Sequence, residues 1–383
     1  MRVAFDVAQT CTQKAGCGYY ADSLAQALAE TADIERLILL HHFGSWINFE
    51  TAAGTAIESE RVSAPFKGLS HEAGRDAWKA IQQGTREFPE SPQIVHSCSY
   101  RAPRTPGIPL VFTVHDVCFW THPEFTTEAN RIECQTGLLD ALKHATGFIF
   151  VSKHARDEFE KVTGGWLAHT GRPWTVIHSA PRRFPETNHS PANIPERYWL
   201  AVGSVEPRKN YEAILDAHEI YCRAVDQPAP LLIAGSRGWL SDDIHRRIAA
   251  LPDTQVRYLG FVSDEDLGYL YRHSLGCLFP SWYEGFGLPV IEAMANGCPV
   301  ICSDRASIPE VAGDAALYID PADPRSISDA MAQIHSRPDL YSNLRQKGLN
   351  RSQAFTWAKT AQKTAAFYQT VVRAYRDIRR SDD

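Results

Sequence analysis

The segment SWYEGFGLPVIEAMANG, from Ser281 to Gly297, indicates the fold of this 383-residue chain most directly. The apolar run before it, residues 275–280, predicts a buried strand. Two glycines in the following loop allow its backbone to approach a ligand closely. A helix is then expected over residues 289–296, with a proline in its first turn and a glycine just past its end. This order of strand, glycine loop and helix is typical of an α/β fold.

A glycine loop that leads directly into a helix predicts an anion-binding site, because the first-turn N–H groups and the positive end of the helix dipole face the ligand. Glu284 lies in the loop and Glu292 about one turn inside the helix. Neither carboxylate favours a bare phosphate. Both can accept hydrogen bonds from the hydroxyls of a sugar and a ribose on either side of a diphosphate. The spacing alone fits equally a strand–loop–helix unit with two solvated glutamates.

The pattern E-G-F-G-L-P-x-x-E-A-M-A-x-G is complete from Glu284 to Gly297, and it resembles the donor-site signature of the retaining GT-B glycosyltransferases of family 4. The resemblance implies that Glu284 lies beside the transferred sugar and diphosphate and that Glu292 binds the ribose. It implies further contacts with the donor from the loop and the helix start, at Gly285, Phe286, Gly287 and Leu288.

The same resemblance implies the architecture: two Rossmann-like domains with parallel sheets facing across a cleft, and a C-terminal helix that crosses back to the first domain. We expect an N-terminal acceptor-binding domain over residues 1–188, a nucleotide-sugar domain over 189–360 and the returning helix over 361–383. A proline-rich, polar stretch at residues 181–196 has the composition of a linker. From residue 198 onward, strands and helices alternate, as in a parallel sheet covered on both faces.

Composition excludes several classes of protein. A hydrophobic content of 44% and a charged content of 22% are typical of a globular protein, and the net charge of −6 gives no support to nucleic-acid binding. Nine scattered cysteines without a C-x-x-C pair favour a reduced, cytoplasmic compartment. The N-terminus has no signal-peptide pattern, and no run of about 18 apolar residues predicts a membrane span.

The first strand of the second domain leads into Gly203 and Ser204 and then into the sequence E-P-R-K-N, which contains Arg208 and Lys209. A guanidinium fork and a lysine ammonium at the mouth of a parallel sheet suit a diphosphate. An exposed basic pair at a helix start is the alternative, and it is disfavoured because cations stabilise the other end of a helix. The family has its diphosphate clamp at this point, and it binds the base through backbone groups at the position of Val262.

In the first domain, a strand over residues 3–7, a loop with Gly16 and Gly18, and a helix from Tyr19 to Glu30 predict the start of a nucleotide-type βαβ fold. A plain tight turn would explain the two glycines nearly as well. Family members often carry a G-I-G-R-Y-like loop here that faces the acceptor and the donor phosphates. This chain has Tyr19 where arginine is frequent, so that side chain receives no such role.

The sequence T-V-H-D at residues 113–116 follows a buried strand, at the edge where open α/β sheets bind their ligands. A histidine that caps the strand is the alternative for an isolated H-D pair. The match to the family's T-x-H-D segment implies that His115 lies against the transferred sugar. Asp116 is expected to orient the loop rather than to react.

A D-x-D spacing at Asp264–Asp266 matches the metal site of the other large glycosyltransferase fold. Here it follows Ser263, and acidic first turns after a serine cap are ordinary helix chemistry. Since no other cluster has metal-ligand spacing, we expect neither a metal nor another cofactor. Ser241 and Ser152 are likewise expected to cap helices over residues 242–251 and 153–162.

The residues and the resemblance together predict a retaining, metal-independent glycosyltransferase. Its donor would be a nucleotide diphosphate sugar, with GDP-mannose favoured over a UDP-sugar because the E-P-R-K-N form resembles mannosyl-transferring members. Its acceptor would be a glycan or lipid-linked glycan of a surface polysaccharide. Two alternatives stay open: a sugar-nucleotide epimerase or hydrolase of the same fold, and a non-catalytic subunit that only binds nucleotide.

The tail, residues 355–380, is expected to be an amphipathic helix. Its four arginines make it basic: Arg373, Arg376, Arg379 and Arg380. A solvated helix face explains such a run. Attraction to an anionic surface, with peripheral association at the cytoplasmic face of the inner membrane, is the alternative function.

Overall fold

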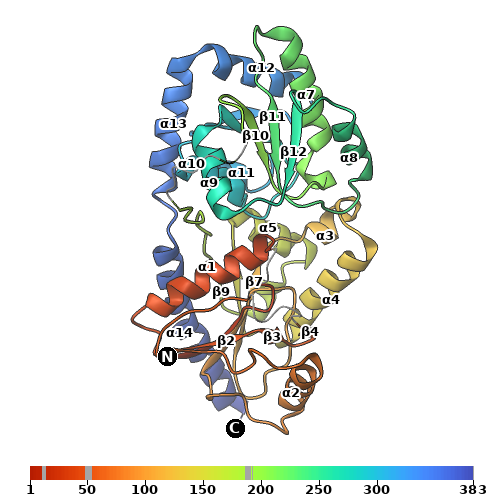
Figure 1. Ribbon diagram of the computed structural model, residues 1–383. Helices are drawn as coiled ribbons and strands as arrows, with labels where there is room; N and C mark the ends of the chain where they lie inside the picture. The colour runs from red at the N-terminus through yellow and green to blue at the C-terminus, as the bar shows by residue number, and fades with distance from the viewer. Residues whose placement is uncertain (11–13, 48–53, 186–190, 192, 383) are drawn as a thin grey trace. The chain divides into compact units, whose positions relative to one another are not determined.

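The computed structural model describes residues 1–10, 14–47, 54–185, 191 and 193–382, and two compact units make up this part of the chain (Figure 1). Unit 1 comprises Met1–Thr121, Glu128–Ser179 and Thr356–Asp383. Unit 2 comprises His122–Thr127 and Ala180–Phe355. Part of the predicted linker, residues 186–190 and 192, lies outside the described residues.

Unit 1 contains a seven-stranded parallel sheet in the order β5-β2-β1-β6-β7-β8-β9. The central strands are fully buried on both faces, as parallel strands covered by helices must be. The sequence predicts two of these strands, β2 and β6, over residues 36–40 and 94–97, and these bounds are confirmed. The strands are β1 (Arg2–Asp6), β2 (Arg36–Leu40), β5 (Val62–Ser63), β6 (Ile94–Ser97), β7 (Leu110–Val114), β8 (Gly147–Phe150) and β9 (Trp174–Val176).

The helices of unit 1 surround this sheet. The first one begins at Gly16 rather than at Tyr19, so the predicted glycine loop is in part the first turn of the helix. A short antiparallel pair, β3 (His42–Phe43) with β4 (Trp46–Ile47), lies outside the main sheet. The helices are α1 (Gly16–Glu30), α2 (His71–Gln83), α3 (Cys118–Thr121), α4 (Glu128–His144), α5 (Lys153–Val162), α6 (Trp166–Thr170) and α14 (Trp357–Asp382).

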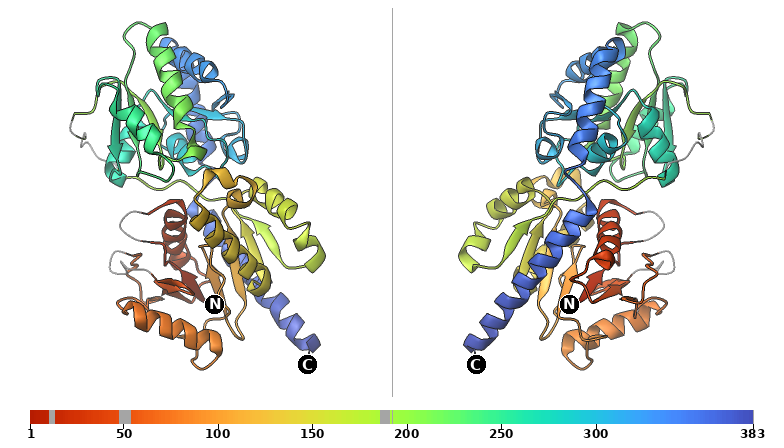
Figure 2. Two further views of the ribbon diagram at one scale, coloured as in Figure 1. Left: turned by 90° about the vertical axis from the view of Figure 1, so that its right-hand side faces the viewer. Right: turned by 90° about the vertical axis from the view of Figure 1, so that its left-hand side faces the viewer.

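The C-terminal helix α14 returns to unit 1, as the sequence predicts, and packs against α1 (Figure 2). A buried chain of hydrogen bonds connects it to the sheet. Tyr368 Oη lies 2.6 Å from His96 Nδ1, and His96 Nε2 lies 2.7 Å from Thr113 Oγ1. All three side chains are completely buried. Because a buried polar group without a partner is costly, these hydrogen bonds specify where α14 can pack on the sheet.

Unit 2 contains a six-stranded parallel sheet in the order β12-β11-β10-β13-β14-β15. This is the doubly wound order, in which the chain reverses direction across the sheet between β10 and β13. The sequence predicts β10 and β11 over residues 199–202 and 231–234, and these bounds are confirmed. The strands are β10 (Trp199–Val202), β11 (Leu231–Ala234), β12 (Val256–Gly260), β13 (Gly276–Phe279), β14 (Val300–Ser303) and β15 (Leu317–Ile319).

The helices of unit 2 follow their strands at short spacing. The sequence predicts a helix over residues 211–224, and α7 has these bounds. In unit 2, Ser263 Oγ accepts a hydrogen bond of 3.0 Å from Asp266 N, so its capping role is confirmed, as is that of Ser152 in unit 1. The helices of unit 2 are α7 (Tyr211–Ala224), α8 (Asp242–Ala249), α9 (Asp264–His273), α10 (Leu288–Ala295), α11 (Ile308–Ala312), α12 (Pro324–Ser336) and α13 (Pro338–Ser352), with 3₁₀ turns at Pro123–Phe125 and Pro207–Lys209.

The prediction that Ser241 caps the next helix is wrong. Its hydroxyl donates to Gly238 O at 2.9 Å and makes no cap hydrogen bond to α8. The backbone of Ser241, at φ −119° and ψ 8°, lacks the extended conformation typical of an N-cap residue. The helix also ends two residues earlier than the predicted end at residue 251, at Ala249.

None of the helices in the described part of the chain combines the length and the low polarity needed to cross a membrane.

We expect His96 to make unit 1 less stable in mild acid. Burial lowers the pKa of His96 to about 3, while an unfolded histidine has a pKa near 6.5. Between these values only the unfolded state binds the proton. The contribution of neutral His96 to the free energy of unfolding is therefore complete above about pH 6.5 and is lost as the pH falls. The loss approaches about 1.4 kcal/mol per pH unit. Urea unfolding at pH 7.5 and pH 5.0 measures it.

A His96→Gln variant should show a shallower pH dependence than the wild type. His169→Gln, an exposed position on α6, serves as the control and should change the free energy of unfolding by less than about 0.5 kcal/mol at pH 7.5. A pH dependence that is the same in His96→Gln and in the wild type would contradict the prediction.

Candidate functional site

The candidate site of unit 2 lies at the reversal point of its sheet. The loops after β10 and β13 leave the carboxyl ends of the two strands that flank this point, where open α/β sheets bind their ligands. Backbone and side-chain bonds join the loops: Trp282 N donates to Arg208 O at 2.9 Å, and Asn210 Nδ2 donates to Pro280 O at 3.2 Å. The position of each loop therefore depends on the other.

Glu284 is held between the two cations of the first loop. Lys209 Nζ donates to its Oε1 at 2.6 Å, and Arg208 Nη1 donates to its Oε2 at 2.7 Å. Glu284 is 5% exposed and Lys209 9% exposed, so these charges depend on each other. Burial favours the neutral carboxyl, but Arg208 and Lys209 outweigh it and hold the pKa of Glu284 below its ordinary value. The carboxylate is therefore ionised at neutral pH.

A second carboxylate, Glu206, fixes the guanidinium of Arg208. Glu206 Oε1 accepts hydrogen bonds from Arg208 Nη2 at 2.6 Å and from Nε at 3.0 Å. The same guanidinium also donates through Nη1 to Tyr283 O at 3.0 Å. Glu206 is 4% exposed. The sequence interpretation gave this residue no role, although its place in E-P-R-K-N, two residues before the arginine, is the signal that could have indicated it.

Glu292 lies on α10, and its partner comes from the start of unit 2. Arg182 Nε donates to Oε1 at 2.6 Å, and Arg182 Nη2 donates to Oε2 at 3.0 Å. Tyr271 Oη donates to Oε2 at 3.4 Å. The third guanidinium nitrogen of Arg182 donates to Asp264 at 2.8 Å. Arg182 lies in the stretch that was interpreted only as a linker, so its contact with the predicted ribose residue is visible only in the fold.

The loop that leads into α10 has the predicted composition and a special backbone. Gly287 precedes the helix with φ +94°, a conformation that glycine adopts without strain, and no side chain caps this end. The ring of Phe286 is 6% exposed and contacts Phe355 edge-on at 5.9 Å. Ser307 Oγ donates to Glu284 O at 2.8 Å. Gly285 is buried and Leu288 half-buried.

The other predicted donor residues of unit 2 surround this centre less closely. Gly203 directly follows β10, and the stem of Lys209 passes over its Cα, where a Cβ would lie 3.3 Å from Lys209 Cε. Ser204 Oγ lies 3.1 Å from Ser236 Oγ. Val262 is half-buried in the turn between β12 and α9.

The candidate residues of unit 1 gather at the carboxyl edge of its own sheet. His115 follows β7, and its Nε2 lies 2.9 Å from Cys98 O. The ring of Tyr20 contacts the imidazole edge-on at 5.0 Å. Burial lowers the pKa of His115, so the ring is neutral at neutral pH. Asp116 Oδ1 accepts from Cys118 N at 3.0 Å, a contact that orders the loop into α3, as the sequence interpretation expects.

The glycines before and in α1 differ in their surroundings. At Gly18 a Cβ would lie 2.6 Å from Gln9 O, so a larger residue would displace the loop after β1. Gly16 is exposed, and a Cβ would meet nothing within 4 Å. The same edge contains Asp6, which the sequence interpretation did not single out. It is 1% exposed and accepts from Ser99 Oγ at 2.6 Å and Ala8 N at 3.0 Å, while burial raises its pKa.

The described residues contain no group of three or more histidine, cysteine, aspartate or glutamate side chains arranged to hold a metal ion. Asp264 lies in the first turn of α9 and forms an ion pair with Arg182.

Two parallel sheets of doubly wound order, with a carboxylate between an arginine and a lysine at the reversal point of one, define a GT-B-type protein. Comparison with solved structures gives the same fold. Sucrose-phosphate synthase from Thermosynechococcus elongatus matches with a TM-score of 0.69 at 21% identity, over 98% of this chain and 100% of that one. Anabaena Alr3699/HepE in complex with UDP-glucose matches with a TM-score of 0.68 at 16% identity, over 97% and 100%.

Sequence comparison finds related glycosyltransferases. Residues 185–351 match the family described as Glycosyl transferases group 1. O-antigen chain mannosyltransferase B of Escherichia coli is 28% identical over 382 residues, which is 92% of this chain and 96% of the relative. Unit 2 thus matches the group 1 glycosyl transferases, which are glycosyltransferase family 4, and nearly the whole chain is similar to a mannosyltransferase.

We expect a Glu284→Gln variant to destabilise ligand-free unit 2. The substitution leaves Lys209 and part of Arg208 buried without a counter-charge, which typically costs about 3–5 kcal/mol. Thermal unfolding of the ligand-free protein measures this loss. Glu219→Gln breaks an exposed pair with Arg223 and should cost less than about 1 kcal/mol. Equal effects of the two substitutions would show that the Glu284 cluster does not stabilise unit 2.

Proposed function

We propose that this chain transfers mannose from GDP-mannose to a glycan or lipid-linked glycan acceptor in surface polysaccharide synthesis, with retention at the anomeric carbon and without a metal ion. The observation that carries the proposal is the Glu284 carboxylate between Arg208 and Lys209, in the loop that leads into α10. The E-P-R-K-N sequence and the mannosyltransferase relative support the sugar and the acceptor class. A UDP-sugar is the alternative donor, because a neighbour of the same fold binds UDP-glucose.

In the proposed reaction, the bond between the anomeric carbon and the diphosphate oxygen breaks, and its electron pair stays on the departing GDP. The acceptor hydroxyl attacks the same face of the sugar, and its proton passes to the departing phosphate. The developing negative charge needs fixed positive groups. Arg208, Lys209 and the start of α10 at Leu288 provide them.

Glu284 connects sugar binding to this charge stabilisation. In the structure it accepts hydrogen bonds from both cations, so the four charges of Glu206, Arg208, Lys209 and Glu284 sum to zero. A carboxylate that turns to accept sugar hydroxyls leaves donors of Arg208 and Lys209 for the diphosphate. Glu206 keeps the guanidinium in place meanwhile. His115 of unit 1 contributes a neutral imidazole, which by resemblance contacts the transferred sugar.

Replacing both cations should abolish transfer. We expect Arg208→Ala with Lys209→Ala to lower the rate by several orders of magnitude, because one preorganised donor is typically worth about 10²–10³ in rate. Transfer of radiolabelled mannose to a glycan acceptor measures it. An exposed arginine of α8, in Arg246→Ala, is the control. Full activity of the double variant would contradict the proposal that Arg208 and Lys209 bind the diphosphate.

The same assay separates the proposal from its alternatives. GDP release that requires an acceptor indicates a transferase, whereas release or conversion of the donor without acceptor indicates a hydrolase or an epimerase. Binding without any turnover indicates a non-catalytic subunit. Excess EDTA should leave the transfer rate unchanged, and strict metal dependence would contradict the metal-free mechanism.

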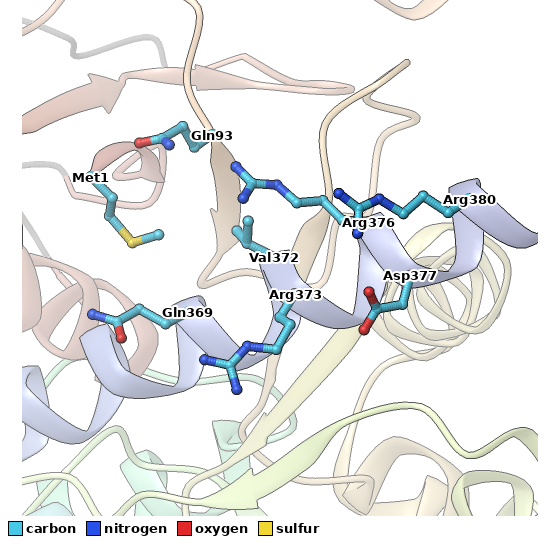
Figure 3. Close-up of a pocket in the computed structure, with 8 residues that line it drawn as sticks. All are labelled: Met1, Gln93, Gln369, Val372, Arg373, Arg376, Asp377 and Arg380. Atoms are coloured by element: carbon cyan, nitrogen blue, oxygen red, sulfur yellow. The ribbon is translucent and has the colours of Figure 1, made fainter.

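A basic pocket on unit 1 supports peripheral association with an anionic membrane (Figure 3). It has a volume of about 370 Å³ and lies beside Met1 and Gln93, at the amino ends of β1 and β6, the sheet edge opposite to His115. Three exposed arginines of α14 and one aspartate line it, for a net charge of 3 − 1 = +2: Arg373, Arg376, Arg380 and Asp377. Phosphate headgroups would neutralise this excess.

We expect the variant Arg373→Ala/Arg376→Ala/Arg380→Ala to bind anionic vesicles roughly 100-fold more weakly at low salt, since each arginine near such a surface contributes about 1 kcal/mol. Sedimentation with phosphatidylglycerol vesicles measures it. The control Lys67→Ala/Lys79→Ala/Arg104→Ala removes equal charge from exposed positions elsewhere on unit 1. Equal losses in both variants would indicate a general charge effect and would contradict a site on α14.

A further inference from the structure

The carboxylate of Glu292 is the least exposed of the charged groups assigned to the donor site. Its residue is 1% exposed, and a carboxylate so deeply buried needs a counter-charge and hydrogen bonds on both oxygens. Arg182 supplies both, because its Nε and Nη2 contact one oxygen each, at 2.6 Å and 3.0 Å. This two-point geometry fixes the orientation of the carboxylate, which a single lysine-like contact would not do.

Arg182 is itself held from three sides. Its guanidinium lies 5.0 Å from the centre of the Phe184 ring, a cation–π contact within the same segment. Its Nη1 donates to Asp264, the first residue of α9, at 2.8 Å. Its side chain is only 11% exposed. The acidic first turn of α9, which carries the D-x-D spacing, thus anchors the arginine that orients Glu292.

The hydrogen bonds of Glu292 within the described part of the chain leave limited acceptor capacity. Each carboxylate oxygen can accept about two hydrogen bonds. Oε2 accepts from Arg182 and, at 3.4 Å, from Tyr271, whereas Oε1 accepts from Arg182. Oε1 therefore retains one acceptor position that the described residues do not fill.

We propose that Arg182 is the positioning residue of the ribose site, holding Glu292 so that Oε1 accepts a ribose hydroxyl of the nucleotide. The inference rests on the proposed nucleotide-sugar function. Arg182 stays in place when the nucleotide binds, because displacing it would break two charge-assisted bonds in a buried site in exchange for hydroxyl bonds of the ribose. It acts through Glu292, which makes its effect specific to nucleotides that carry ribose hydroxyls.

The test is calorimetric binding of GDP and of 2′,3′-dideoxy-GDP, which lacks both hydroxyls, with the UDP pair measured in parallel. The wild type should prefer the ribonucleotide by about ten- to a hundredfold, the usual range for a hydrogen bond to a charged group. Arg182→Ala should lose most of this preference and bind the dideoxynucleotide as the wild type does. Arg182→Lys should recover part of it. Arg182→Ala/Glu292→Gln should discriminate no less than Glu292→Gln alone.

Arg272→Ala is the matched control. Arg272 joins the same segment to the end of α10, through Pro185 O at 3.3 Å and Asn296 Oδ1 at 3.2 Å, without contacting Glu292. It should keep the wild-type preference. Should Arg182→Ala not fold, the Arg182→Lys measurement carries the test.

The outcomes separate this inference from the proposed function. A wild type that binds no nucleoside diphosphate overturns the proposed function. A wild type that binds and discriminates, with an Arg182→Ala variant that discriminates equally, overturns the positioning role alone. Tighter binding by Arg182→Ala also overturns it, because Arg182 would then cover the carboxylate and compete with the ribose.

Discussion

Burial of the Glu284 carboxylate is the constraint on which the centre of unit 2 depends. A charge that is 5% exposed requires partners, and the two partners it has come from the loop after the neighbouring strand. Lys209 is buried as well, so water cannot replace Glu284 as the partner of its ammonium group. The two loops must therefore close on each other at the reversal point of the sheet. The rest of the proposed donor site, from Gly203 to the start of α10, is arranged around that closure.

The site combines two ion-paired carboxylates with different surroundings. Glu284 lies in the loop that leads into α10 and has two cations from the neighbouring loop. Glu292 has a single arginine with two-point contact and a tyrosine hydroxyl. A nucleotide diphosphate sugar presents hydroxyls at both ends and negative charge in the middle. This alternation of charge and hydroxyl groups is the physical reason that two carboxylates can serve a ligand that is itself an anion.

Unit 1 also buries polar side chains, but here the buried groups are neutral. His96 is buried at the centre of its sheet, and Tyr368 and Thr113 satisfy its two ring nitrogens. The link attaches the last helix of the chain to a sheet formed by the first 180 residues or so. His115, at the carboxyl edge of the same sheet, is also kept neutral by burial. A neutral imidazole there can donate or accept a hydrogen bond without adding charge to this edge of the sheet.

The sequence by itself determined the parallel α/β class, most strands of the central sheets, and the helices at residues 153–162 and 211–224. Local chemistry decides these features: unbroken apolar runs, serine caps and the glycine and proline that bound helices. The loop containing Glu284 and the basic pair at residues 208–209 were predicted from local chemistry together with the resemblance to the family's donor-site motif. Ser241 failed as a cap because its backbone angles, which composition does not specify, point its hydroxyl at Gly238 O.

Only the tertiary structure decided which charges meet. Arg182 and Glu292 are 110 residues apart, and Arg208 and Glu284 are 76 apart. No periodicity connects such positions, since the pairing arises from the order of strands in the sheet. A proline-rich segment and an acidic helix start both have ordinary local explanations. The fold brings them together at Arg182, which pairs with Asp264 and with Glu292, and the cost of burying the Glu292 charge is what makes this contact specific.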